Sequence, residues 1–308
     1  MKPIAEHKIP RDWVILGREI ENYQGRFLVF VLGENDTGKS SLCRYLVSYL
    51  QGQGRRLAWI DADLGQSHLG PPTSVGMTLL PPPGKGEGPL WIRFVGSTSP
   101  VGHLIQSLVA VRIMVDKAIQ LKVDGIILDT CGYVSGRVAA EFKFQKIELV
   151  KPTHLIALER RKELAVLLKN FSARRSLLLR RFSVPEYIPY KSRVQRAEYR
   201  RERFKKYFQE SAAINFMFRG MGLHGHIPSF RNLGDWTGLL IGFCDEMNDT
   251  MALGIVQEVD LQQKQVSCLT PLRSIEKVRS IQFGSLYLDQ SGQEFSRSAF
   301  HNRTLKGC

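Results

Sequence analysis

The sequence of 308 residues lacks the features of secreted, membrane-spanning and zinc-binding proteins. Its five cysteines are scattered and none lies at C-x-x-C spacing, which argues against a disulfide framework and against a zinc site. No apolar run is long enough to cross a bilayer, and residues 1–7 lack the apolar core of a secretion signal. We therefore expect a cytoplasmic protein with no membrane partner.

Acidic residues are scarce in one part of the chain. The whole sequence carries a formal charge of +14, and between residues 160 and 206 sixteen Lys and Arg residues stand against four Glu and no Asp. Such a basic block is either a solvated helical face or a surface for a polyanion. A phosphate-binding motif elsewhere in the chain favours the polyanion.

That motif lies at residues 33–41, which match the pattern G-x-x-x-x-G-K-S. A strand-forming apolar run precedes it at 26–32, and helically spaced apolar residues follow it at 42–50, so it has the strand–loop–helix context of a phosphate-binding loop. We expect the Lys39 ammonium to reach the terminal phosphates and the Ser40 hydroxyl to bind magnesium. The nucleotide-binding residues are Gly33, Glu34, Asn35, Asp36, Thr37, Gly38, Lys39, Ser40 and Ser41.

Carboxylates follow two further apolar strands. Asp61 and Asp63 come after the strand predicted at 56–60, and Asp129 closes the strand predicted at 123–130. Ligands gather at the carboxyl ends of parallel strands, so we expect these acids to face the metal ion and the γ-phosphate. The hydroxyl-rich residues 97–103 open a helix and are equally suited to holding a phosphate or to capping that helix.

Strands and helices alternate as far as residue 180, which predicts an α/β fold of the P-loop NTPase class, a mostly parallel sheet covered by helices on both faces. From residue 235 short strands of period two predict a small β-rich C-terminal domain. We therefore expect a P-loop domain at 1–234, which the resemblance described below makes a kinase domain, and a β-rich domain at 235–308. The first domain would carry a basic helix around 191–208.

Four arginines of this basic helix share one face, because they recur every three or four residues. Four guanidinium groups on one face repel one another unless an anion lies there. The helix could cover a transferred phosphate as a lid, bind nucleic-acid phosphates, or face solvent. The four residues are Arg193, Arg196, Arg200 and Arg203.

Taken together, these motifs resemble the polyribonucleotide 5'-hydroxyl kinases, a family that includes the kinase subunit of the pre-mRNA cleavage machinery and the kinases of ribosomal RNA processing. The motifs that carry the resemblance are residues 33–41, 61–66, 71–73, 129–133 and the arginine helix. The chain is similar to the short prokaryotic members. The resemblance implies transfer of the γ-phosphate of ATP, with Mg²⁺, to the 5'-hydroxyl end of RNA, and it leaves DNA open as an acceptor.

The resemblance also implies roles for single residues. Lys39, Ser40 and Ser41 would hold phosphates and magnesium, and Asp63 would orient and deprotonate the 5'-hydroxyl. The metal shell would comprise Ser40, Asp61, Asp63 and Asp129, and the catalytic residues would be Lys39, Asp63, Arg196 and Arg200. The substrate would be bound by Gln66, Thr98, Tyr133, Arg193 and Arg203, with Tyr133 stacking on the terminal base where relatives often have tryptophan.

Two other functions compete with this reading. A GTPase-type switch or metal-insertion chaperone would also have a phosphate-binding loop and the D-x-x-G pattern of residues 129–132, but the sequence has no N-K-x-D segment to recognise guanine. A scaffold could bind ATP without catalysis. The presence of Lys39, Ser40, Asp63 and the lid arginines favours an active enzyme.

Overall fold

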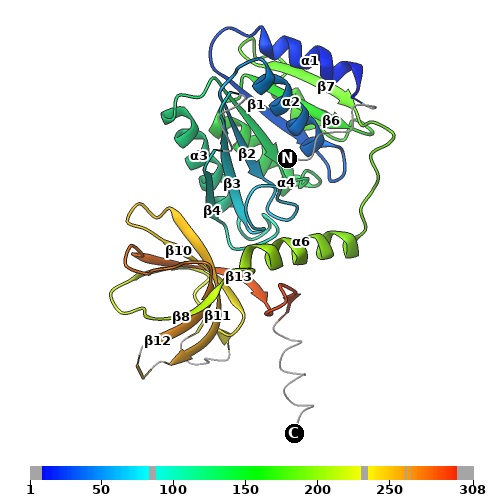
Figure 1. The fold of residues 1–308 in the computed structure, drawn as a ribbon. Coiled ribbons are helices and arrows are strands. Elements are labelled where there is room, and N and C mark those ends of the chain that lie inside the picture. The colour runs from blue at the N-terminus through cyan, green and yellow to red at the C-terminus, as the bar shows by residue number, and fades with distance from the viewer. Residues whose placement is uncertain (1–8, 83–87, 230–234, 261, 264, 297–308) are drawn as a thin grey trace.

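The computed structural model describes residues 9–82, 88–229, 235–260, 262–263 and 265–296. Five parallel strands form the centre of the first part of the chain (Figure 1). In spatial order the strands are β2 (Leu57–Ala62), β5 (Gly125–Thr130), β1 (Phe27–Gly33), β6 (His154–Glu159) and β7 (Leu178–Ser183). All residues of β2, β5, β1 and β6 are buried, as expected for parallel strands covered on both faces.

Helices cover both faces of this sheet. Side chains alternate along β1, so that Phe27, Val29 and Val31 pack against one set of helices while the residues between them pack against the other. The first set is α1 (Arg11–Glu21) and α2 (Lys39–Gly52). The second is α3 (Leu104–Gln120), α4 (Arg137–Val150) and α5 (Ala165–Lys169). The predicted fold class is confirmed.

Two antiparallel strands extend the sheet beyond β2. These are β3 (Ser74–Leu80) and β4 (Leu90–Phe94), and β3 pairs with both β2 and β4. The sheet is therefore mixed on this side, and it continues into the C-terminal part because β4 also pairs with β11 (Thr250–Asp260) at Ile92 and Thr250. No helix of the described residues is long and apolar enough to span a membrane.

The C-terminal part is a set of mainly antiparallel strands around an aromatic-rich core that includes Phe216, Trp236 and Phe283. The longest strands are β11 and β13, and each is continuous. β8 and β9 precede residue 235, where we expected this part to begin, yet they pair with β12 and β13. The strands are β8 (Ala212–Met217), β9 (Gly222–Gly225), β10 (Leu239–Cys244), β11 (Thr250–Asp260), β12 (Gln265–Thr270), β13 (Ser280–Leu288) and β14 (Glu294–Phe295).

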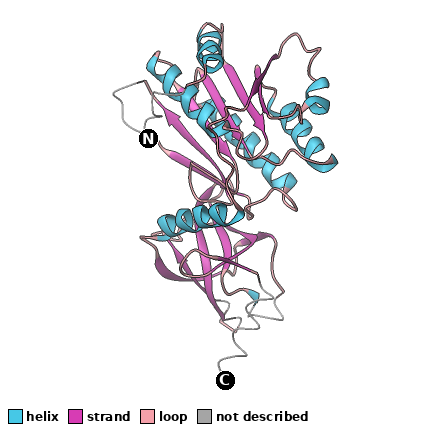
Figure 2. Ribbon diagram, turned by 90° about the vertical axis from the view of Figure 1, so that its right-hand side faces the viewer, coloured by secondary structure: helices cyan, strands magenta, loops and turns pink. Residues whose placement is uncertain are grey.

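Helix α6 (Arg193–Phe208) lies between the two parts, across the C-terminal strands (Figures 1 and 2). It begins at a capping box, in which the Ser192 hydroxyl accepts from the Gln195 backbone N–H and the Gln195 side chain accepts from the Ser192 backbone N–H. Its Phe204 side chain is fully buried in a cluster with Leu240 and Leu253. The apolar side of α6 is thus packed on the C-terminal strands.

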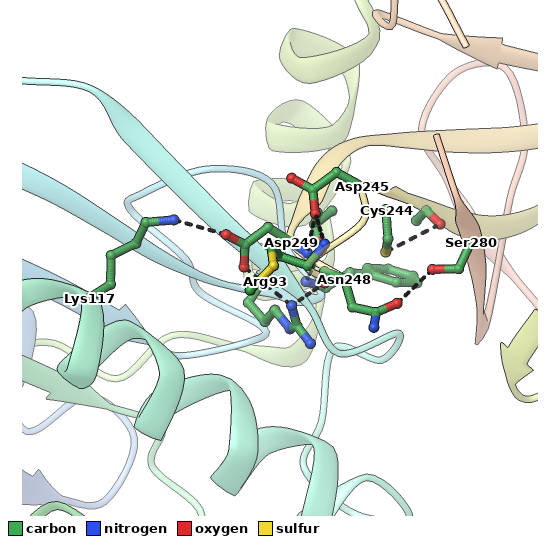
Figure 3. Close-up of polar contacts among 11 residues, drawn as sticks. Arg93, Lys117, Cys244, Asp245, Asn248, Asp249 and Ser280 are labelled. Carbon is green, nitrogen blue, oxygen red and sulfur yellow. Dashed lines mark hydrogen bonds and ion pairs between the residues drawn. The ribbon is translucent and has the colours of Figure 1, made fainter. Parts of the chain in front are cut away.

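A polar contact joins the C-terminal strands directly to the first part (Figure 3). Asp249, in the turn between β10 and β11, accepts a hydrogen bond from Lys117 Nζ of α3 at 2.9 Å and lies 3.4 Å from Arg93 Nη1 of β4. The turn is held in shape by Asp245, whose Oδ1 accepts from the backbone N–H of Asp249 at 2.9 Å. The turn therefore holds Asp249 in position for its ion pairs with Lys117 and Arg93.

Candidate active site

The phosphate-binding loop joins the end of β1 to the start of α2. Gly38 has a φ of 89°, in the left-handed region that favours glycine, and a Cβ there would lie 2.2 Å from Ile188 Cδ1. The Glu34 carbonyl accepts hydrogen bonds from Thr37 Oγ1 at 2.9 Å and from Lys39 Nζ at 2.6 Å. The loop is thus closed on itself, with the Lys39 ammonium folded over it.

Asp129 lies beside this loop at the end of β5. Its side chain is fully buried, and neither carboxylate oxygen has a hydrogen-bond partner among the described residues. Burial raises the pKa of Asp129 to about 6, while the nearby Lys39 ammonium and Ser40 hydroxyl act to lower it. An unpartnered buried carboxylate next to the Ser40 hydroxyl fits a hard divalent cation.

The described residues contain no group of three or more His, Cys, Asp or Glu side chains that could hold a metal ion. This does not conflict with magnesium, which usually takes one or two carboxylates and completes its shell with water and substrate phosphates. The Ser40 hydroxyl and the unpartnered Asp129 carboxylate are compatible with that mode of binding.

Asp61 is fully buried and differs from Asp129 in its contacts. Its Oδ1 accepts from the Asp63 backbone N–H at 3.0 Å, and its Oδ2 accepts from the backbone N–H groups of His68 at 2.5 Å and Leu69 at 3.1 Å. Burial, with further contributions from Asp129 and Asp63, raises the pKa of Asp61 to about 8. Both oxygens are therefore engaged in holding the 63–69 loop, and a metal-binding role for Asp61 stays a prediction.

Asp63 stands where two cavities meet. Its Oδ1 accepts from the backbone N–H groups of Gly65 at 3.1 Å and Gln66 at 2.9 Å, which fixes the carboxylate at the start of the loop. One cavity, of about 320 Å³, lies over the phosphate-binding loop, and we call it the P-loop cavity. The other, of about 550 Å³, we call the side cavity. Both are lined by Asn35, Asp63, Gln66 and Arg196.

The predicted site residues divide between these cavities. The P-loop cavity is lined by Asn35, Asp36, Gly38, Lys39, Ser40 and Ser41. The side cavity is lined by Glu34, Thr98, Tyr133 and Arg200. Arg193 and Arg203 are not among the lining residues of either cavity. Four other predicted residues, Gly33, Thr37, Asp61 and Asp129, are also absent from both linings. The structure thus brings most of the predicted residues together around the two cavities, but not these six.

Polar contacts fasten α6 to the loop that follows Asp63. Tyr199 Oη donates to the Ser67 carbonyl at 2.8 Å, and Arg203 Nη2 donates to the carbonyls of His68 at 3.1 Å and Gly70 at 2.6 Å. Gln66 Nε2 donates to the Arg196 carbonyl at 3.3 Å. Arg203 therefore anchors the helix to the loop.

The other two arginines already have carboxylate partners. Arg196 Nη2 lies 2.5 Å from Asp36 Oδ2 of the phosphate-binding loop, and Arg200 pairs through two nitrogens with Glu294 of β14. The expectation that this face needs a bound anion to relieve repulsion is wrong for Arg196 and Arg200. These partners could not be predicted from the sequence, because Asp36 and Glu294 are distant from the helix along the chain.

The segment between β7 and α6 also lines the P-loop cavity, and sequence reasoning missed it. Tyr187, Ile188 and Pro189 contribute to the wall, and the Lys191 backbone N–H donates to Asp36 Oδ2 at 2.9 Å. Arg160 Nη2 donates to the Asp36 carbonyl at 2.8 Å. No local motif identifies these residues. For residues 187–191, the position directly before the basic helix was the one available signal.

Comparison with known proteins gives consistent results. The sequence-family model described as "mRNA cleavage and polyadenylation factor CLP1 P-loop" matches residues 33–210, more than half of the chain. A protein of Pyrococcus abyssi (strain GE5 / Orsay) named polyribonucleotide 5'-hydroxyl-kinase is 26% identical, over 95% of this chain and 96% of its own length. A protein of the same name from Methanocaldococcus jannaschii is 27% identical, over 93% and 94%.

Solved structures show the same fold. The wild-type Clp1p–Pcf11p complex contains a chain that matches with a TM-score of 0.69 and 14% identity, covering 91% of this chain and 80% of that one. The resemblance inferred from the motifs is therefore confirmed, and the phosphate-binding loop is that of a nucleotide-binding protein. The chain belongs to the CLP1 P-loop family.

Proposed function

We propose that the protein is an ATP-dependent polynucleotide 5'-hydroxyl kinase that transfers the γ-phosphate of ATP to the 5'-hydroxyl end of RNA. The observation that carries the proposal is the position of Asp63, which lines both the P-loop cavity and the side cavity. A carboxylate at this junction can take a proton from an alcohol in one cavity while that alcohol attacks a phosphate in the other. The names of the archaeal relatives support an RNA 5'-hydroxyl as the acceptor.

The P-loop cavity takes the triphosphate. The backbone N–H groups of the loop and the Lys39 ammonium bind the β- and γ-phosphates, and Lys39 leaves the Glu34 carbonyl to do so. Ser40 and Asp129 would hold Mg²⁺, which when bound neutralises charge on the β- and γ-phosphate oxygens. Arg196 lines both cavities, so its guanidinium can exchange Asp36 for the oxygens of the transferred phosphoryl group.

The side cavity takes the end of the polynucleotide. Asp63 Oδ1 is held by two backbone N–H groups, so the carboxylate is fixed in place when it accepts the proton of the 5'-hydroxyl. The 5'-oxygen then forms a bond to the γ-phosphorus, the bond to the β-phosphate oxygen breaks, and ADP leaves. Tyr133 offers a ring for the terminal base, and Thr98 and Gln66 offer hydrogen bonds.

The test is an end-labelling assay with γ-labelled ATP, magnesium and matched RNA and DNA oligonucleotides that carry 5'-hydroxyl ends. We expect label on RNA, and loss of label with Lys39→Ala or Asp63→Asn. Asparagine keeps the acceptor for the Gly65 and Gln66 N–H groups, so Asp63→Asn should fold and bind ATP normally. Asp116→Asn is the matched control, because Asp116 is a partly exposed acid on α3 paired with Arg112.

Two results would contradict the proposal. The first is that no RNA or DNA end becomes labelled although the protein binds ATP. The second is tight binding of GTP with weak binding of ATP, which would point to a switch protein instead. Full activity of Asp63→Asn would remove Asp63 as the base and with it the structural observation that carries the proposal, leaving the names of the archaeal relatives as its support.

A further inference from the structure

Two lysines of α4 are fully buried beneath the candidate site. Lys143 and Lys146 both have no exposed surface, and neither forms a salt bridge with a carboxylate of the described residues. Transfer of an ammonium group into the protein interior without a counter-charge costs several kcal/mol. This cost makes each of the two lysines a candidate for a functional role, and their contacts differ.

Lys143 is hydrogen-bonded to the segment that leaves β5, residues 129–133, which we call the β5 exit segment. Its Nζ donates to the Cys131 carbonyl at 2.6 Å and to Thr130 Oγ1 at 3.2 Å, and it lies 3.6 Å from Cys131 Sγ. The Thr130 hydroxyl in turn donates to the Val31 carbonyl of β1 at 2.7 Å. The ammonium thus holds the middle of a segment that begins with Asp129 and ends with Tyr133.

The β5 exit segment forms one wall of the side cavity, through Cys131, Gly132 and Tyr133. The wall is closely fitted to the phosphate-binding loop, since a Cβ on Gly132 would lie 2.2 Å from Asn35 Oδ1 and 2.4 Å from Asn35 N. On its other side the Tyr133 ring lies 6.3 Å from the ring of Phe142 in α4. A small shift of this segment therefore changes the shape of the side cavity.

The charge of Lys143 acts in the same place. It lies behind the wall of a cavity that also carries Arg196 and Arg200, and it is shielded from water by complete burial. Electrostatic interactions are stronger in such a low-dielectric setting than at the surface. Burial lowers the pKa of Lys143, while Cys131 acts to raise it, and in its protonated form the side chain favours a negatively charged ligand in the side cavity without touching it.

We propose that Lys143 is a positioning residue for the polynucleotide: it holds the wall formed by residues 131–133 and places a buried positive charge behind it. The proposal rests on the proposed function, because it takes the side cavity as the site of the polynucleotide end. It assigns to Lys143 no contact with the reacting atoms.

Lys146 provides a matched control within the same helix. It is equally buried, and its ammonium donates to Ser107 Oγ of α3 at 3.4 Å and lies 4.3 Å from the centroid of the Phe142 ring. No hydrogen bond links it to a residue of the β5 exit segment in the described part of the chain. If burial of a charge were all that mattered, the two lysines would respond alike to substitution.

The experiment compares Lys143→Met with Lys146→Met, since methionine keeps most of the lysine side chain's length and removes its charge. For each variant we would measure ATP affinity, the affinity for a fluorescent 5'-hydroxyl RNA oligonucleotide without ATP, and KM and kcat. Lys143→Met should keep ATP affinity within about twofold but weaken oligonucleotide binding and raise its KM by roughly tenfold, the size of one charged hydrogen bond. Lys146→Met should leave both affinities within about twofold.

The proposal is overturned if Lys143→Met binds the oligonucleotide like the unmodified protein, or if Lys146→Met loses as much affinity. If Lys143→Met does not fold, Lys143→Gln replaces it, because its amide can donate to the Cys131 carbonyl but carries no charge. Its oligonucleotide affinity should fall below that of the unmodified protein with ATP affinity kept, and an equal loss of ATP affinity would overturn the proposal. Failure of the proposed function is a separate result, seen as absence of transfer by the unmodified protein.

Discussion

Substitution of Lys146 by methionine should stabilise the protein, because it removes a buried ammonium and keeps most of the side-chain volume. Burial, with a further contribution from Lys143 and partly opposed by Cys131, lowers the pKa of Lys146 from 10.5 to about 8. At 1.36 kcal/mol per pKa unit this corresponds to a penalty on folding of about 3 kcal/mol. The substitution forfeits one long hydrogen bond to Ser107, worth about 0.5 kcal/mol.

The pH dependence of this stability difference shows whether the buried ammonium of Lys146 causes it. Below pH 8 the ammonium is charged in both the folded and the unfolded protein, so the whole penalty is present. Between pH 8 and 10.5 the folded protein gives up the proton while the unfolded chain keeps it, and the penalty shrinks as pH rises. The advantage of Lys146→Met in free energy of unfolding should therefore fall from about 2–3 kcal/mol at pH 7 to about 1 kcal/mol at pH 9.5.

Urea unfolding followed by circular dichroism, at pH 7 and pH 9.5, measures this difference. The unmodified protein and Lys146→Met would be compared at equal ionic strength, with Ser107→Ala to isolate the lost hydrogen bond. A variant no more stable than the unmodified protein at pH 7 would refute the reasoning. So would a gain in stability that stays the same at both pH values, since that gain would come from packing.

Two further predictions concern the phosphate-binding loop and the junction of the two parts. Gly38→Ala should weaken ATP binding at least tenfold, because a left-handed φ and the 2.2 Å approach to Ile188 both disfavour a Cβ. Calorimetric titration with ATP measures this affinity, and an unchanged affinity would contradict the prediction. Asp249→Ala should lower the free energy of unfolding by about 1 kcal/mol at low salt, because Lys117 and Arg93 lose their partner, and by less in 1 M salt. A loss that is independent of salt would show that packing is responsible.

The parts of the site that the sequence predicts are those built from contiguous residues. The phosphate-binding loop carries its own geometry, because Gly38 and Lys39 act through positions a few residues apart. Asp63 and Asp129 could be placed beside it because each closes a buried strand, and adjacent parallel strands end at the same edge of a sheet. Local pattern and topology together are enough for this part of the site.

Contacts between distant segments were not predictable in this way. Arg200 forms an ion pair with Glu294, and Arg196 forms one with Asp36. One carboxylate lies far after α6 in the sequence and the other far before it, so no residue spacing indicates these pairs. In the sequence, Lys143 and Lys146 look like ordinary charged residues of a helix, which are normally exposed, whereas both are fully buried. Strand β3 was missed because its pairing partners, β2 and β4, decide its conformation more than its own composition does.

Helix α6 is attached differently on its two sides, and this determines where the molecule can come apart. Toward the C-terminal strands it buries Phe204 completely and is approached so closely by Gly292 that a Cβ there would lie 3.0 Å from the Arg201 carbonyl. Toward the nucleotide it makes hydrogen bonds and ion pairs, which water can replace at little net loss. Entry of a substrate should therefore loosen α6 on the P-loop side first, while its apolar side stays packed on strands that the pairing of β11 with β4 ties to the first part of the chain.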